Sequence, residues 1–143
     1  MSAPYHPPAV PTTGTLDALP SPLLVRGLSV VLPAHDEVET LAEVVRDALR
    51  VGATCAGVLE VIIVDDGSRD GTADVAHALA RAEERVRVVT HPQNLGYGAA
   101  LRSGFQHAQH EWIFYTDSDG QFDLTELPRL LALLGRYDVV TGY

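Results

Sequence analysis

Two aspartates separated by one residue, Asp117 and Asp119, carry the clearest chemical signal in this sequence. They follow 112–116, a short apolar and aromatic run that is typical of a buried strand. Because side chains of an extended chain alternate in direction, both carboxylates should point to the same side. Two adjacent carboxylates repel each other, and a divalent cation relieves that repulsion. Carboxylates and the nearby Gln121 carbonyl are hard oxygen ligands, which suit Mg²⁺ or Mn²⁺.

For Asp117 and Asp119, the alternative is a tight acidic turn without a metal, because Gly120 supplies the positive φ that such turns need.

Another polar cluster, at 33–37, follows the apolar run 28–32. A third cluster, at 65–68, follows 59–64, which is nearly continuous in valine and isoleucine. Such a continuous run is typical of a parallel strand that is covered on both faces. For this third cluster the alternative is a strand-end turn that caps the next helix.

The elements that must position these clusters alternate between strand and helix. Helices are indicated by apolar residues at i, i+3 and i+4, as at Leu41, Val44 and Val45. The order β-α-β-α-β-α-β-α-β predicts an α/β fold with a mostly parallel, Rossmann-like sheet and helices on both faces. Strands are expected at 28–32, 59–64, 86–90, 112–116 and 138–141. Helices are expected on the apolar stripes that begin at Leu41, Val75, Leu101 and Leu124.

Pro33 is expected to end the first strand, because its nitrogen cannot donate to a sheet ladder. In parallel sheets, ligands bind beyond the carboxyl ends of the strands, where all three polar clusters would meet. Gly96 and Gly98 open the third helix and would bring main-chain N–H groups to the same edge, where an anion could bind them. Close packing of helix on sheet is the alternative for these glycines. A dinucleotide site ending at Asp117 is disfavoured, because the glycines do not directly follow the strand.

Composition narrows the class of protein. The 143 residues suffice for one domain at most, and 46% of them are hydrophobic, as in an ordinary globular chain. The net charge of −9 argues against nucleic-acid binding, which needs a basic face. Cys55 is the single cysteine, so a reducing compartment such as the cytoplasm is expected. Residues 1–26 are rich in proline and are expected to form a flexible leader without a signal peptide.

Four motifs together resemble a known family. They are P-A-H-D-E at 33–37, V-D-D-G-S-R-D-G-T at 64–72, N-L-G-Y-G-A-A at 94–100 and D-S-D-G-Q at 117–121. In this order they resemble the family 2 glycosyltransferases of the GT-A fold, and are most similar to the dolichyl- or polyprenyl-phosphate sugar transferases. The resemblance implies a nucleotide-sugar-binding domain at 27–143. Family members continue further, so the C-terminal acceptor part is expected to be missing.

The resemblance also implies roles for individual residues. Glu37 would accept charge-assisted hydrogen bonds from the ribose of the donor, while Asp65 would order its turn. Asp117, Asp119 and Gln121 would hold the Mg²⁺ or Mn²⁺ that bridges the donor diphosphate, which makes the two aspartates the catalytic pair. The residues implied to bind the nucleotide sugar are Pro33, His35, Glu37, Val64, Asp66, Asp117 and Ser118.

The reaction implied by the resemblance inverts the anomeric centre. A hexose would pass from GDP-mannose or UDP-glucose to a polyprenyl or dolichyl phosphate at the cytoplasmic face of a membrane. A phosphate acceptor is already an anion, so it needs no general base. The alternative is a truncated, non-catalytic module that only binds nucleotide sugars. The uncovered sheet edge of such a short chain would favour self-association or a partner chain. The six histidines show no zinc spacing, and most are expected to be exposed.

Overall fold

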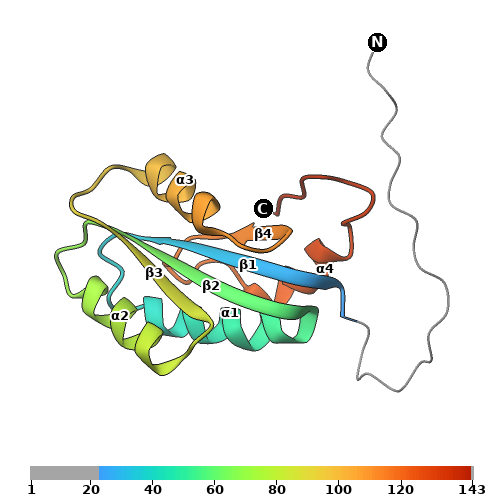
Figure 1. Ribbon diagram of the computed structural model, residues 1–143, viewed down its shortest axis with the longest axis horizontal. Helices are drawn as coiled ribbons and strands as arrows, with labels where there is room; N and C mark the ends of the chain where they lie inside the picture. The colour runs from blue at the N-terminus through green and yellow to red at the C-terminus, as the bar shows by residue number, and fades with distance from the viewer. Residues whose placement is uncertain (1–22, 143) are drawn as a thin grey trace, which may run out of the picture.

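The computed structural model describes residues 23–142. Its centre is a sheet of four parallel strands in the order β3-β2-β1-β4 (Figure 1). The strands are β1 (Val25–Ala34), β2 (Ala56–Asp66), β3 (Val86–His91) and β4 (Trp112–Tyr115). The predicted α/β class and parallel sheet are therefore confirmed.

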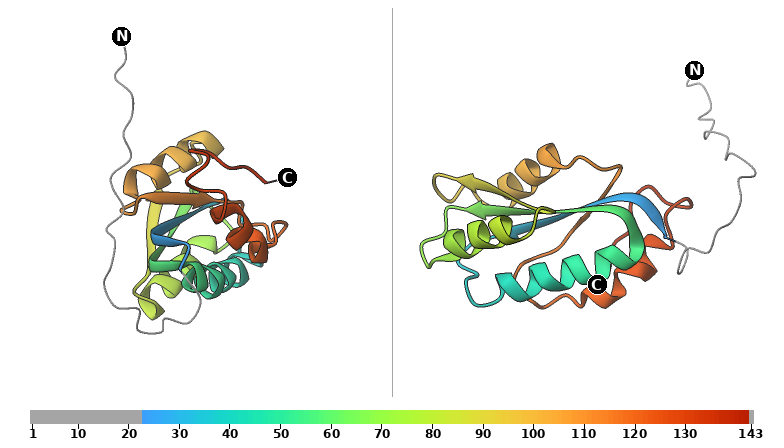
Figure 2. Two further views of the ribbon diagram at one scale, coloured as in Figure 1. Left: turned by 90° about the vertical axis from the view of Figure 1, so that its right-hand side faces the viewer. Right: turned by 60° about the horizontal axis from the view of Figure 1, so that its bottom comes forward.

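Helices cover both faces of the sheet. α1 (Leu41–Cys55) and α2 (Thr72–Ala82) lie on one face, and α3 (Tyr97–His107) lies on the other (Figures 1 and 2). The 3-10 turn η1 (Leu124–Glu126) and the short helix α4 (Leu127–Leu131) pack beside α1. Each helix is a crossover between parallel strands or follows the last of them, so the chain repeatedly returns to the same edge.

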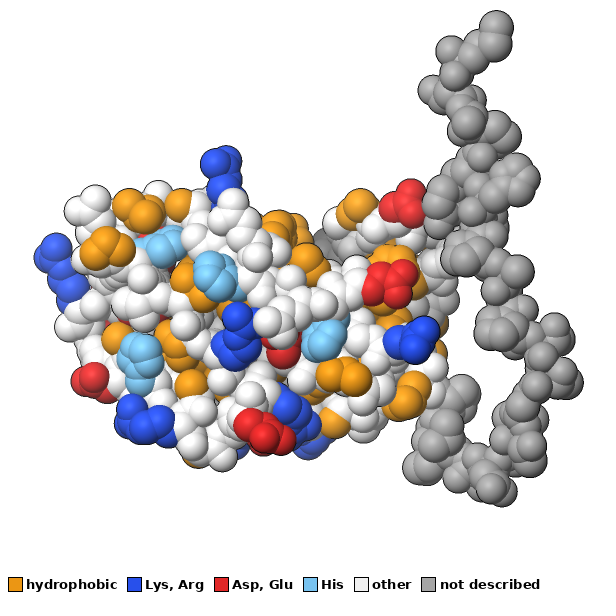
Figure 3. Space-filling view, in the orientation of Figure 1, with side chains coloured by type: hydrophobic (Ala, Val, Ile, Leu, Met, Phe, Trp, Pro, Cys, Tyr) orange, Lys and Arg blue, Asp and Glu red, His pale blue; other side chains and the backbone are white. Residues whose placement is uncertain are grey.

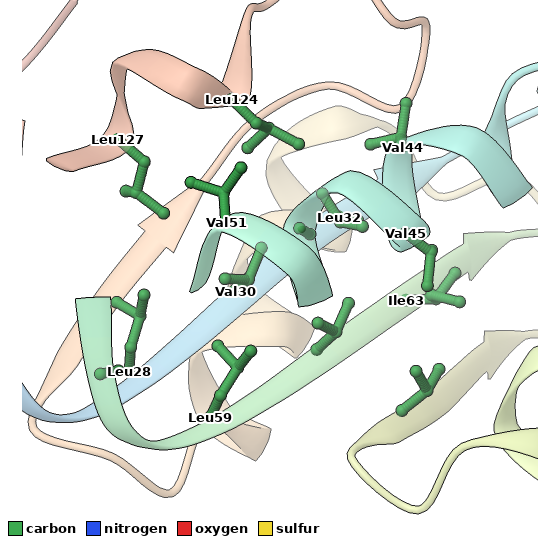
Figure 4. Packing of buried hydrophobic residues seen from close by; sticks show 14 of the residues in the cluster. Leu28, Val30, Leu32, Val44, Val45, Val51, Leu59, Ile63, Leu124 and Leu127 are labelled. Carbon is green, nitrogen blue, oxygen red and sulfur yellow. The ribbon is translucent and has the colours of Figure 1, made fainter. Parts of the chain in front are cut away.

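The core has two layers because side chains of β1 and β2 alternate in direction. The larger layer lies between the sheet, α1 and the C-terminal helices, as Figure 4 shows for its labelled residues. The smaller layer joins Val31, Ile62 and Val64 to Ala100 of α3. Each fully buried aliphatic side chain contributes about 1.5–3 kcal/mol. This burial fixes the strand register, and the register sets which residues meet at the carboxyl edge.

Gly104 lets α3 lie unusually close to the sheet. A Cβ atom at this position would stand 2.2 Å from Val31 Cγ1. By contrast, a Cβ atom at Gly96 or Gly98 would meet nothing within 4 Å. Close packing therefore explains Gly104 but neither of the glycines at the start of α3. Gly96 instead has φ of 97°, a conformation that favours glycine.

The prediction that Pro33 ends the first strand is wrong. β1 continues to Ala34, and Pro33 pairs with Val64 in the parallel register with β2. On its other side β1 has lost its neighbour, since β4 pairs only up to Val31 with Tyr115. The Pro33 carbonyl oxygen accepts instead from Ser118 Oγ on that side. A missing N–H is tolerated there because no strand is present to receive it.

The predicted fifth strand at 138–141 is also wrong. These residues have no strand conformation, and Val139 is 80% exposed. They line an open groove beside β4 and make no ladder with it, so their backbone has no sheet partner.

The predicted leader at 1–26 falls mostly outside the described residues, although Val25 and Arg26 belong to β1. None of the helices within residues 23–142 has the length and apolarity to cross a membrane.

Candidate functional site

A cavity of about 390 Å³ lies at the carboxyl edge of the sheet. It is bounded by the ends of β1, β2 and β4 and by the start of α3. Its lining residues are Pro33, Ala34, His35, Glu37, Asp66, Asn94, Gly96, Tyr97, Ala100, Asp117, Ser118 and Asp119. The structure thus brings together the three polar clusters that element order alone predicts to meet.

Hydrogen bonds join the loop after β1 to the loop after β2. Asp36 accepts a hydrogen bond of 2.8 Å from Arg69 N, and its own main-chain N donates to Ser68 Oγ. Glu37 N donates to Thr72 Oγ1 at 2.9 Å. Asp36 has φ of 54°, which the cross-loop bonds hold in place. The loop that carries His35 and Glu37 is therefore fixed by the loop that follows β2.

His35 is held through both ring nitrogens. Nδ1 lies 2.8 Å from the Asp66 main-chain oxygen, which can only accept, so Nδ1 carries a proton. In the neutral ring Nε2 is then an acceptor, and Asn94 Nδ2 donates to it at 3.2 Å. With both ring nitrogens engaged, the imidazole of His35 lines the cavity.

The adjacent aspartates after β2 have different environments. Asp65 accepts from Ser68 N at 3.2 Å and orders the turn. Asp66 is 4% exposed and accepts three strong hydrogen bonds, from His91 Nδ1, Leu95 N and Gly96 N. Burial by itself would raise the pKa of Asp66, but these hydrogen bonds outweigh it and hold the pKa below its usual value. Asp66 is therefore a buried anion.

Ser118 fixes the segment between the two aspartates of the D-S-D motif. Its side chain is buried and donates to the Pro33 oxygen at 2.8 Å, while its own carbonyl accepts from Thr40 Oγ1 at 2.6 Å. Asp117 and Asp119 flank this anchor and both line the cavity. The two aspartates therefore border the same hollow, and their shared role as metal ligands stays a prediction.

Asp117 and Asp119 supply some, but not all, of the ligands that a divalent cation needs. Neither Asp117 nor Asp119 forms an ion pair with an arginine of the described chain. In residues 23–142 there is no group of three or more His, Cys, Asp or Glu side chains that could hold an ion. Two carboxylates that leave the remaining ligands to water and substrate phosphates are a usual arrangement for Mg²⁺. Gln121 lines the neighbouring groove, and its N–H donates to Asp119 Oδ1 at 3.0 Å.

Tyr97 is a site residue that the sequence motifs did not single out. Partial burial and a hydrogen bond to the Asp117 carboxylate raise the pKa of Tyr97 to about 12. The phenol is therefore protonated at neutral pH. Tyr97, Asp117 and Asp119 line both the cavity and a second, larger hollow of about 610 Å³. That hollow is an apolar groove along β4, lined by Phe105, Ile113 and Tyr115 among others.

Three further residues depart from the sequence-based expectation. Val64 is fully buried under α3 and does not line the cavity. Asn94 lines it and contacts His35, although its motif pointed only to the glycines. His91 is 8% exposed, unlike most of the other histidines. One signal could have shown the burial of His91. It ends the strand beside β2, where it lies in register with Asp66.

Charged side chains of both signs lie on the face of the molecule that Figure 3 shows. Figure 3 shows one face of the molecule, on which arginine side chains lie singly among acidic and apolar ones. Acidic side chains line the cavity, and no arginine of residues 23–142 does.

The sequence of residues 29–142 matches the model of glycosyl transferase family 2. The chain belongs to glycosyl transferase family 2. It is 34% identical over 119 residues to glycosyltransferase AglD of Haloferax volcanii, covering 80% of this chain and 19% of that protein. It is 35% identical over 124 residues to undecaprenyl-phosphate 4-deoxy-4-formamido-L-arabinose transferase of Pseudomonas syringae pv. syringae, covering 83% and 36%. The family 2 chain therefore spans about a third or less of the length of these relatives.

Solved structures of glycosyltransferases share the fold. Glucosyl-3-phosphoglycerate synthase from Mycobacterium tuberculosis, in complex with Mn²⁺, UDP-glucose and phosphoglyceric acid, superimposes with a TM-score of 0.61. It is 28% identical, over 76% of this chain and 39% of its own. Mannosyltransferase PcManGT from Pyrobaculum calidifontis, in complex with GDP-Man and Mn²⁺, gives a TM-score of 0.62 at 23% identity, over 75% and 32%. The predicted GT-A type of fold is confirmed.

Proposed function

We propose that this family 2 chain forms the donor-binding part of an inverting glycosyltransferase, which transfers a hexose from a nucleotide sugar to a polyprenyl phosphate. One observation carries the proposal. Asp117 and Asp119 open onto the same cavity as the residues predicted to bind a nucleotide. A nucleoside diphosphate needs a surface for its base, an acceptor for its ribose hydroxyls and compensation for its phosphate charge, and the cavity would offer all three once Asp117 and Asp119 hold a divalent cation.

The nucleoside would lie between the ends of β1 and β2. The face of His35, beside Pro33, suits stacking against a base, and Asp66 Oδ2 keeps a lone pair for a base N–H. Val64 would support this pocket from beneath. The Glu37 carboxylate would accept from the ribose hydroxyls, as its main chain is already fixed by Thr72.

The diphosphate would lie between the D-S-D segment and the start of α3. Asp117 and Asp119 would hold Mg²⁺ or Mn²⁺, with the Gln121 carbonyl close by. When bound, such an ion stabilises the negative charge on the departing nucleoside diphosphate. The main-chain N–H groups after Gly96 would face the same phosphates. Both solved relatives described above were crystallised with Mn²⁺ and a sugar nucleotide, which supports this arrangement.

In the transfer step, an oxygen of the acceptor phosphate would bond to C1 of the sugar as the C1–O bond to the diphosphate breaks. The phosphate is already an anion, so the protein need not remove a proton. A polyprenyl acceptor is supported by the relative whose name specifies undecaprenyl phosphate. Such a lipid places the reaction at a membrane surface, and we propose its cytoplasmic side. GDP-mannose and UDP-glucose are the proposed donors. The fold and the comparisons give no support to self-association.

Calorimetric titration with GDP, UDP and their sugar conjugates tests donor binding. We expect binding in Mn²⁺ or Mg²⁺ that is lost with chelator and in Asp119→Asn. Asp123→Asn is the matched control, because Asp123 lies on the same segment but outside the cavity and caps Thr125 N. Asparagine caps as well as aspartate, so this variant should bind normally. No binding by the wild-type chain would contradict the proposed donor site.

Turnover separates transfer from binding alone. The purified chain is incubated with the nucleotide sugar that binds, Mn²⁺ and undecaprenyl phosphate in detergent, and release of the nucleoside diphosphate is followed. Release that depends on the lipid phosphate supports the transferase. Intact donor binding without release would favour a non-catalytic binding module for this length of chain.

A further inference from the structure

A largely buried chain of hydrogen bonds runs from Asp66 in the wall of the proposed nucleotide cavity to Ser103 on α3. Asp66 and His91 face each other in register at the ends of β2 and β3, and His91 Nδ1 donates to Asp66 Oδ1 at 2.7 Å. The other ring nitrogen, Nε2, lies 2.8 Å from Ser103 Oγ on α3. His91 is 8% exposed, so the imidazole is clamped between a carboxylate and a helix hydroxyl.

The carboxylate in turn shapes the turn before α3. Asp66 Oδ1 also accepts from Leu95 N at 2.8 Å, and Oδ2 accepts from Gly96 N at 2.9 Å. These bonds hold Gly96 at its φ of 97° directly before the first residue of α3. Asn94 completes the turn, since its Oδ1 also accepts from Gly96 N while its Nδ2 donates to His35. One wall of the cavity therefore depends on the Asp66 carboxylate.

We infer that His91 is a positioning residue for nucleotide binding, acting through Asp66 on the 94–96 turn. This inference rests on the proposed function. A buried carboxylate stays ionised only while enough donors surround it. Without the His91 donor, Asp66 Oδ1 would keep only the Leu95 N–H, and the carboxylate would gain from protonation or rotation. Either change releases Leu95 N and Gly96 N, and with them Asn94 and the His35 ring.

The order Ser103–His91–Asp66 also matches the connectivity of a hydrolase triad, but its placement does not. Ser103 lies in the middle of α3, and neither Ser103 nor His91 lines the nucleotide cavity or the apolar groove. A nucleophile needs a bound substrate beside it, and neither hollow would bring one to this serine. The hydrogen bonds therefore serve geometry rather than covalent catalysis.

Three variants test the inference by calorimetry with GDP or UDP at saturating Mn²⁺. His91→Leu removes the donor and is expected to raise Kd about tenfold, comparable to the loss of one charge-assisted hydrogen bond. His91→Asn places an amide N–H near the former Nδ1 and should bind within about twofold of wild type. Ser103→Ala frees one side of the ring and should weaken binding about threefold, as expected for one neutral hydrogen bond.

A spectroscopic readout distinguishes positioning from general loss of stability. In amide proton spectra, the Leu95 and Gly96 signals should move in His91→Leu and keep nearly wild-type shifts in His91→Asn. Wild-type affinity in His91→Leu, or equal weakening in His91→Leu and His91→Asn, would overturn the inference while leaving the proposed function intact. If His91→Leu does not fold, wild-type affinity in Ser103→Ala overturns it. No nucleotide binding by the wild-type chain would instead overturn the proposed function, and this inference with it.

Discussion

Ser118 Oγ donates a hydrogen bond of 2.8 Å to the main-chain oxygen of Pro33, 85 residues earlier in the chain. The bond closes the gap that β4 leaves when it ends beside Val31. It also joins the segment that carries Asp117 and Asp119 to the loop that carries His35. The acidic pair therefore has a fixed position relative to the proposed base pocket.

Removing this hydroxyl should affect stability and binding together. Ser118→Ala leaves the buried Pro33 oxygen without its donor, so we expect a loss of about 1–2 kcal/mol in the free energy of unfolding. Metal-dependent nucleotide affinity should also fall severalfold, because the Asp117–Asp119 segment is released on one side. Urea unfolding and calorimetry measure the two effects. Thr125→Ala removes an exposed hydroxyl on the same segment and should change neither by much.

The fold was predictable where local sequence determines burial. The valine and isoleucine run in β2 is buried on both faces, and only a central parallel strand provides such a place. The acidic pair was predictable for a related reason, since polar residues directly after a buried strand must lie at the sheet edge. By contrast, the hydrogen bond from Thr40 to Ser118 spans 78 residues, and no local pattern marks either partner.

The incorrect and missing predictions also depend on contacts between residues that are far apart in the sequence. Pro33 reads as a strand end only if both neighbours of β1 continue, and one of them does not. Residues 138–141 have strand-like composition but form no ladder with the free edge of β4 beside them. His91 and Asn94 become site residues through contacts with Asp66 and His35, which depend on register across separate strands and loops.

Substitution of Gly104 tests the close approach of α3 to the sheet. A Cβ atom there would overlap Val31, which sits in the buried layer that also holds Val64. We expect Gly104→Ala to cost about 1–3 kcal/mol in the free energy of unfolding, as overpacking usually does. Gly98→Ala is the matched control in the same helix, where the added methyl meets nothing within 4 Å. That variant should be neutral or more stable by about 0.5 kcal/mol. Similar losses in both variants would contradict this account.

The acidic pair should give opposite effects with and without metal. Without a cation, Asp117 and Asp119 share one cavity wall with no arginine partner in the described chain, so Asp119→Asn should raise stability by about 0.5 kcal/mol. With Mn²⁺, wild type should gain stability by mass action and the variant should not. Thermal unfolding with Mn²⁺ and then with chelator measures both. A variant that is stabilised by Mn²⁺ as much as wild type would rule out Asp119 as a ligand.

The ionisation of Glu60 should make stability depend on pH at the end of the sheet opposite the site. Its buried carboxylate accepts from Ser29 Oγ, Gln109 N and Arg87 Nη1 at 2.7, 2.7 and 2.9 Å. Burial opposes ionisation, but these bonds outweigh it and lower the pKa of Glu60 below its ordinary 4.5. A lowered folded-state pKa contributes stability that is complete above pH 4.5 and is lost as pH falls through the folded-state pKa. Glu60→Gln should therefore cost about 2 kcal/mol at neutral pH and progressively less below pH 4.5 in urea unfolding. A cost that stays constant down to the acid transition would show that the charge of Glu60 does not stabilise the fold.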